Sequence, residues 1–169
     1  MNYATIKPCD VANGPGVRVS LFVSGCTHRC KGCFNPEAWD FAYGTPFGAA
    51  QTAEILQLLA PDYIRGFSLL GGEPFEAANQ PAVLALLQEI RHTYPQKSIW
   101  AYSGYTFEQL CAGALPLLKL CDVLVDGPFI QEQKNLRLRF RGSENQRILD
   151  IPLSLAAGAP VNWNEEEMQ

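Results

Sequence analysis

Apolar runs alternate along this chain with segments in which apolar residues recur at helical spacing, and this alternation constrains the fold more than any other feature of the sequence. Repeated strand-helix units of this kind are typical of a mainly parallel sheet with helices packed against it. The predicted strands are 17–24, 66–70, 98–103, 122–126 and 147–151. The predicted helices are 52–59, 79–94 and 106–120, the last with a break near Gly113 and Pro116. We therefore expect an α/β fold.

The length and charge of the chain limit its organisation and its partners. The 169 residues suffice for one sizeable core and are too few for two full enzyme domains, so we expect a single domain over 1–169 with a frayed acidic tail over 162–169. A net charge of -4 and an isoelectric point near 5.2 give no drive toward nucleic acid. The N-terminus lacks a basic-then-apolar signal pattern, and no apolar stretch approaches the ~20 residues that span a bilayer. We expect a cytoplasmic protein without a nucleic-acid or membrane partner.

Polar segments rich in glycine or cysteine follow four of the predicted strands. They are the segment 24–33, Gly71-Gly72-Glu73-Pro74, Tyr102-Ser103-Gly104-Tyr105 and Asp126-Gly127-Pro128. In parallel α/β sheets the loops that follow the strands converge at one edge, and ligand sites are built there. The four segments are therefore predicted to face one cavity.

Three of the six cysteines, Cys26, Cys30 and Cys33, lie within eight residues in the spacing CxxxCxxC. Three thiolates this close can hold three corners of a cubane iron-sulfur cluster, whereas zinc or an ordinary ferredoxin cluster needs a fourth protein ligand. An iron without a protein ligand favours chemistry on a bound molecule. The alternative is a structural zinc site completed by His28 or a distant thiol, and His28 is otherwise expected to be an exposed loop residue without a chemical role.

Other polar residues carry weaker signals. Cys9, Cys111 and Cys121 are scattered, and we expect them to be small buried residues rather than ligands of a second cluster. Asp126 ends an apolar strand, where a cation or cofactor contact and a structural turn are both open.

The CxxxCxxC segment after one strand, combined with Gly71-Gly72-Glu73-Pro74 after the next, resembles the radical S-adenosylmethionine superfamily. The resemblance implies that the three cysteines bind a 4Fe-4S cluster and that S-adenosyl-L-methionine chelates the fourth iron. It implies a methionine-binding role for the glycine pair and Pro74, with Glu73 or its neighbouring backbone receiving the ammonium group, and a ribose contact for Ser103. Members often have an aromatic residue just before the last cysteine, whereas this chain has Gly32.

A closer resemblance, over nearly the whole chain, is to the activating proteins of anaerobic ribonucleotide reductase. The motifs that carry it are Asn13-Gly14-Pro15-Gly16-Val17-Arg18, Cys33-Phe34-Asn35-Pro36-Glu37-Ala38-Trp39, Val125-Asp126-Gly127-Pro128-Phe129 and Arg141-Gly142-Ser143-Glu144-Asn145-Gln146-Arg147, together with the segment around Ser103. The family motif ordinarily begins with aspartate where this chain has Asn13. This resemblance implies an incomplete TIM-type βα barrel of about five or six mainly parallel strands.

The family resemblance also implies a reaction and its partners. The reduced cluster cleaves S-adenosylmethionine, and the 5'-deoxyadenosyl radical removes hydrogen from a glycine near the C-terminus of the large subunit of the reductase, with a flavodoxin-type electron donor. Arg18, Tyr105 and the basic stretch 134–147 are candidates for docking that glycine loop or holding the cofactor carboxylate. The alternatives are an activase of another glycyl radical enzyme such as pyruvate formate-lyase, a small-molecule radical enzyme, and a non-enzymatic electron carrier.

Overall fold

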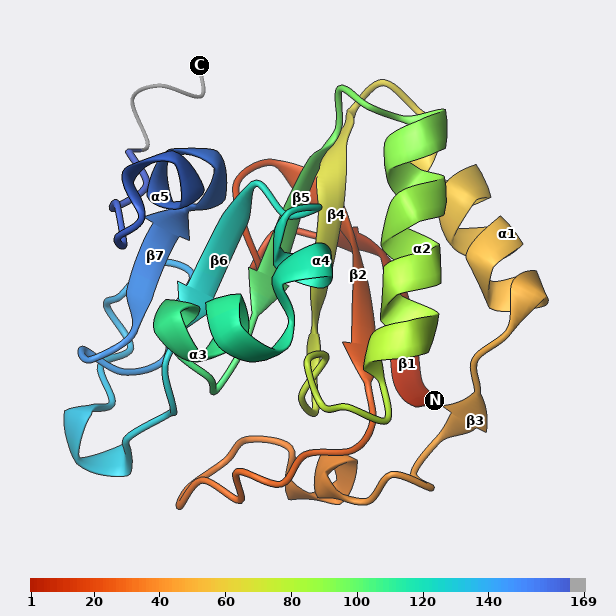
Figure 1. Ribbon diagram of the computed structural model, residues 1–169. Helices are drawn as coiled ribbons and strands as arrows, with labels where there is room; N and C mark the ends of the chain where they lie inside the picture. The colour runs from red at the N-terminus through yellow and green to blue at the C-terminus, as the bar shows by residue number, and fades with distance from the viewer. Residues whose placement is uncertain (165–169) are drawn as a thin grey trace.

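A computed structural model describes residues 1–164 and contains one sheet of seven strands in the order β3-β1-β2-β4-β5-β6-β7 (Figure 1). The strands are β1 (Asn2–Asp10), β2 (Val17–Val23), β3 (Thr45–Pro46), β4 (Ile64–Gly71), β5 (Ser98–Tyr102), β6 (Val123–Asp126) and β7 (Arg147–Asp150). Strands β2, β4, β5 and β6 pair in parallel, and β1, β3 and β7 pair antiparallel at the two sides. The α/β class is confirmed.

The sheet corrects the expected number and direction of strands. Seven strands are present rather than about five or six, because the N-terminal segment forms β1 and pairs with both β2 and β3. The sheet is open, so it does not confirm an incomplete TIM-type barrel. Strand β1 escaped prediction because it alternates weakly and contains Pro8, which lies where the register shifts between Lys7 and Asp10.

The helices pack on one face of the sheet (Figure 1). They are α1 (Ala49–Leu59), α2 (Gln80–Thr93), α3 (Phe107–Gly113), α4 (Leu115–Leu118) and α5 (Ile151–Ala157). Two short 3-10 helices, η1 (Pro36–Trp39) and η2 (Gln131–Gln133), lie instead in the loops between β2 and β3 and between β6 and β7. The predicted break between α3 and α4 is confirmed, whereas α5 was missed. Its start carried a readable signal, because the Asp150 side chain caps the Leu153 amide and Pro152 occupies the first turn.

The main core lies between these helices and the sheet. Val83, Leu86, Leu87 and Ile90 form the buried face of α2, as their helical spacing predicts. Burying each such side chain contributes about 1.5–3 kcal/mol. Alternate residues of the strands point to the opposite face, where Trp100, Val123 and Val125 form a second, smaller cluster.

The second cluster also holds the start of the segment that was predicted to fray. Asn162 bridges to Leu149, and the Trp163 ring packs 4.9 Å from the Trp100 ring, centroid to centroid. The predicted tail therefore does not begin at 162, and the three consecutive glutamates of that tail lie outside the described residues.

Candidate active site

A cavity of about 540 Å³ lies at the C-terminal edge of the parallel strands. Its lining comes from all four predicted segments, including Cys26, Gly71, Ser103 and Gly127, and continues along Leu70 and Tyr102. The expectation that these segments face one cavity is confirmed. The reason is topological, because β2, β4, β5 and β6 run in the same direction and end at the same edge.

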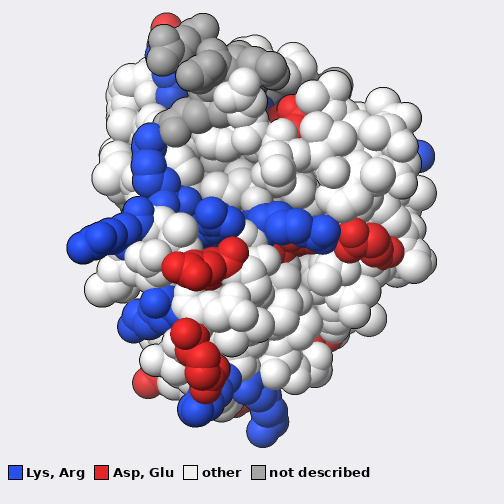
Figure 2. All heavy atoms as spheres, turned by 90° about the vertical axis from the view of Figure 1, so that its left-hand side faces the viewer, with Lys and Arg blue, Asp and Glu red and all other residues white. Residues whose placement is uncertain are grey.

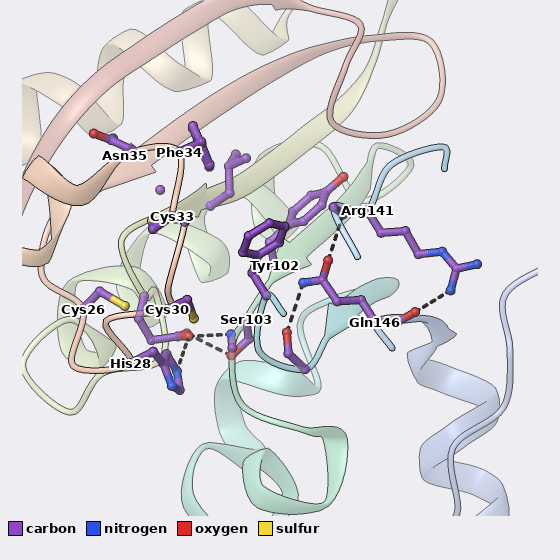
Figure 3. Close-up of a pocket in the computed structure, with 18 of the residues that line it drawn as sticks. Cys26, His28, Cys30, Cys33, Phe34, Asn35, Tyr102, Ser103, Arg141 and Gln146 are labelled. Atoms are coloured by element: carbon purple, nitrogen blue, oxygen red, sulfur yellow. Dashed lines mark hydrogen bonds and ion pairs between the residues drawn. The ribbon is translucent and has the colours of Figure 1, made fainter. Parts of the chain in front are cut away.

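Cys26, Cys30 and Cys33 all line this cavity as free, partly exposed thiols (Figure 3). The loop that carries them is anchored to the segment around η1, since the Cys26 amide donates to Trp39 O at 3.2 Å. Burial raises the pKa of the Cys26 thiol to about 11, so ligation by this thiolate requires a metal to displace its proton.

The three thiols suit a cluster better than a single ion. Within residues 1–164, no three His, Cys, Asp or Glu side chains come close enough together to hold one metal ion. A cubane does not require such convergence, because each cysteine binds a different iron. Three soft thiolates in one cavity therefore fit a 4Fe-4S cluster, whereas the zinc alternative has no closed set of ligands.

Gly71 and Gly72 allow the loop after β4 to lie against the start of the cysteine loop. Gly71 has φ +114°, and a Cβ there would lie 2.5 Å from the Val23 amide nitrogen. A Cβ at Gly72 would lie 2.6 Å from Gly25 O. The Glu73 amide donates to the same Gly25 O at 2.8 Å. Close packing of backbone on backbone is thus one reason for glycine at both positions.

The Glu73 carboxylate joins three loops inside the protein. Its side chain is 1% exposed and accepts hydrogen bonds from Phe75 N at 3.0 Å, Ser103 Oγ at 2.9 Å and Gly104 N at 2.8 Å. His28 Nε2 lies 3.0 Å from the same carboxylate, and this contact raises the pKa of the His28 imidazole. Glu73 and Ser103, both expected at the cofactor, are therefore hydrogen-bonded to each other.

The remaining predicted site residue lies apart from these. Pro74 is buried and is not among the described residues that line the cavity, although Gly71, Gly72, Glu73 and Ser103 are. Its fixed ring shapes the turn that leads into Phe75 rather than the cavity wall.

Sequence reasoning missed four residues that hold the cysteine loop in place: Thr27, His28, Glu76 and Asn79. Thr27 donates to Glu76 from its amide at 2.8 Å and from its hydroxyl at 2.5 Å. Asn79 donates to Ser24 O and to the backbone carbonyl oxygen of Glu73, both at 3.0 Å. The expectation of an exposed His28 was wrong, because its side chain is 18% exposed and its ring packs on Tyr105. No local pattern signals such contacts between distant loops.

Arg18 does not face the cavity, contrary to the expected docking role. It is fully buried and donates to Ser68 Oγ, Phe67 O and Ser98 O at 2.7–2.9 Å. The guanidinium also lies 5.6 Å from the centre of the Trp100 ring. Arg18 therefore holds β4 and β5 together behind the site.

Asp126 has a structural partner at the end of β6. It accepts from Phe107 N at 2.7 Å and from Arg147 at 2.5 and 2.9 Å, and Arg147 also bonds Glu108. Arg147 lowers the pKa of the exposed Glu108 carboxyl to about 2. Of the two roles that the sequence left open for Asp126, these contacts favour the structural one.

Basic side chains gather on the face that bears β7, with acidic side chains among them (Figure 2). Lys134 and Arg141 line the cavity, and Arg137 and Arg139 are exposed beside it. Two exposed apolar side chains, Phe34 and Leu136, also line the cavity. The cavity mouth thus combines positive charge with apolar surface.

The remaining cysteines differ in exposure. Cys121 is buried as expected, Cys111 is partly exposed, and Cys9 is exposed on β1, contrary to expectation.

Within residues 1–164, no helix is both long and apolar enough to cross a membrane.

Comparison with known proteins gives one consistent family. Residues 12–149 match the family described as 4Fe-4S single cluster domain. The anaerobic ribonucleoside-triphosphate reductase-activating protein of Vibrio cholerae is 47% identical over 150 residues, which cover 88% of this chain and 97% of that protein. The proteins of the same name from Escherichia coli K12 and Enterobacteria phage T4 are 44% and 41% identical, over 86% and 88% of this chain and 96% and 93% of their own lengths. With a 4Fe-4S domain and relatives of this similarity along most of its length, the chain belongs to the family of anaerobic ribonucleoside-triphosphate reductase-activating proteins.

Proposed function

We propose that this chain activates an anaerobic ribonucleoside-triphosphate reductase as a radical S-adenosylmethionine enzyme, with a 4Fe-4S cluster and S-adenosylmethionine as its cofactors. The observation that carries the proposal is the cavity that the cysteine loop shares with Gly71, Gly72 and Ser103. The names of the relatives given above support the reductase as the partner rather than pyruvate formate-lyase. A plain electron carrier is likewise not favoured.

The proposed ligands of the cluster are Cys26, Cys30 and Cys33, one for each of three irons. One-electron cleavage of S-adenosylmethionine, which generates the radical that takes hydrogen from a glycine, is the chemistry that such a cluster supplies when bound. The cavity is partly open at its mouth, and a reductase segment bound there would keep water away from the reactive radical.

The contacts of Glu73 indicate different roles for its carboxylate and for the backbone of the loop after β4. Three protein donors and His28 already surround the Glu73 carboxylate. We therefore assign the ammonium of the methionine moiety to backbone carbonyl oxygens near Glu73, and an orienting role to the carboxylate. Ser103 Oγ donates to Glu73 and accepts from Tyr105 N at 3.0 Å, which leaves one acceptor lone pair for a ribose hydroxyl.

Five finer points belong to the same proposal. The substrate is the glycine-bearing C-terminal region of the reductase, which enters at the basic and apolar mouth of the cavity. The electron donor is of the flavodoxin type, and the setting is the reducing cytoplasm, in keeping with six free cysteines. The cavity continues onto the sheet face that bears Tyr102, opposite the main helical core, as in a shortened, incomplete barrel. We assign the whole chain to one radical S-adenosylmethionine domain.

The proposal is tested by anaerobic reconstitution with iron and sulfide, chemical reduction and addition of S-adenosylmethionine and the reductase. We expect 5'-deoxyadenosine to form, and its formation to depend on the reduced cluster. A chain that binds iron but leaves S-adenosylmethionine intact would be an electron carrier or a metal-binding protein, and the proposed activity would be wrong.

A further inference from the structure

We propose that His28 is a positioning residue, which fixes the cysteine loop against the two loops of the cofactor site through Glu73 and Tyr105. The proposal rests on the proposed function and assigns to that site a residue that contributes neither a cluster ligand nor a cofactor contact. His28 lies between Cys26 and Cys30 in the sequence. A contact that fixes its side chain therefore also restrains the backbone that carries two proposed ligands.

The imidazole is held from two sides. Its Nε2 lies 3.0 Å from a carboxylate oxygen of Glu73, which follows β4. Its ring packs edge-on against Tyr105, which follows β5, with centroids 4.3 Å apart and planes at 63°. With 18% exposure for the His28 side chain and 1% for Glu73, this contact is shielded from water. The cysteine loop is thereby fixed to both neighbouring loops at one point.

Glu73 also links the cysteine loop to the loop after β5, which forms another part of the cavity wall. Its carboxylate also accepts from Ser103 Oγ and Gly104 N, and all three residues line the cavity together with His28. Removing the imidazole leaves a buried carboxylate without its ionisable partner, while the hydrogen bonds from Phe75 N on its own loop and from Ser103 and Gly104 on the loop after β5 remain. The expected consequence is a cysteine loop that keeps its thiols but loses its fixed orientation toward the cofactor loops.

Gly104 gives independent evidence that the ring position is built into the fold. A Cβ at Gly104 would lie 2.6 Å from Cδ2 and 2.7 Å from Nε2 of His28. A side chain at position 104 would therefore force the imidazole to move from its place. This contact predicts that Gly104→Ala disturbs the same function as His28→Ala, and that the two changes are not additive.

The variants His28→Ala and His28→Gln test the proposal, with His92→Ala as the matched control. His92 is the other histidine of the chain, exposed at the end of α2. Each protein is reconstituted anaerobically, and its iron and sulfide are measured per chain. The reduced cluster is then titrated with S-adenosylmethionine while its electron paramagnetic resonance spectrum is recorded.

We expect all three variants to bind as much iron as the wild type. The S-adenosylmethionine concentration that gives half of the spectral change should rise at least tenfold in His28→Ala. It should stay within about threefold of wild type in His28→Gln, whose amide can still donate to Glu73, and should not change in His92→Ala. Gly104→Ala should resemble His28→Ala, and the double variant should be no worse than His28→Ala alone. In the cluster-free chain, His28→Ala should speed hydrogen exchange in residues 24–33.

The outcomes separate the two proposals. An unchanged titration in His28→Ala would overturn the positioning role, and so would loss of iron in proportion to loss of the spectral response, because the residue would then only support folding of the loop. A wild-type cluster that does not respond to S-adenosylmethionine at all would instead refute the proposed function.

Discussion

Replacing Arg18 by methionine should destabilise the fold rather than weaken docking of a partner. Methionine fills much of the same volume but removes every donor to Ser68 Oγ, Phe67 O and Ser98. Leaving a buried acceptor without its partner costs about 1–3 kcal/mol, so the two fully buried bonds and the partly buried ones together predict a loss of about 3–6 kcal/mol. Domains of this size have about 5–15 kcal/mol in total.

The free energy of unfolding, measured by urea denaturation of the cluster-free chain, checks this value. Arg18→Lys is the control, because one ammonium can satisfy part of the same set of acceptors and should give an intermediate loss. At roughly 2–4 °C per kcal/mol, Arg18→Met should also lower the melting temperature by about 6–24 °C. A loss below about 1 kcal/mol, combined with weaker binding of the reductase, would refute the structural role and restore the docking role.

Three further predictions concern the site and its supports. Gly71→Ala should destabilise the chain by about 2–4 kcal/mol in urea unfolding, because φ is +114° and the new Cβ would lie 2.5 Å from the backbone of β2; a neutral change would contradict the close packing. Glu108, whose pKa Arg147 lowers to about 2, contributes stability that is complete above the unfolded pKa near 4.5 and is lost as the pH falls toward 2. The difference in melting temperature between wild type and Glu108→Gln should therefore shrink over that range, and a constant difference would exclude the ion pair. Cys30→Ala should lose cluster iron and cofactor cleavage, whereas Cys121→Ala should keep both, as measured by iron analysis and 5'-deoxyadenosine.

The parallel part of the sheet could be predicted because buried parallel strands are nearly continuous apolar runs, and β2, β4, β5 and β6 all have this pattern. Because these strands run in the same direction, the loops that follow them were expected at one edge of the sheet. Strand β1 could not be recognised in the same way, since most of its residues are partly or fully exposed and its pairing is interrupted by register shifts. An exposed edge segment carries little of the alternation on which such predictions depend.

The identities of the site residues could be predicted more readily than their interactions. The spacing of Cys26, Cys30 and Cys33 is a local signal, whereas the contact of His28 with Glu73 joins residues 45 positions apart. Arg18 was misjudged for a related reason, because arginine is almost never fully buried and its acceptors lie on other strands. Long-range hydrogen bonds of this kind follow from the fold and leave no periodic trace in the sequence.

The activity proposed for this chain is the generation of a glycyl radical on an anaerobic ribonucleotide reductase. The most direct test mixes the reduced, reconstituted chain with S-adenosylmethionine and the reductase, and records the electron paramagnetic resonance spectrum of the reductase. We predict a glycyl doublet that disappears when the target glycine of the reductase is replaced by alanine. Cleavage of S-adenosylmethionine without a doublet on the reductase would contradict the claim.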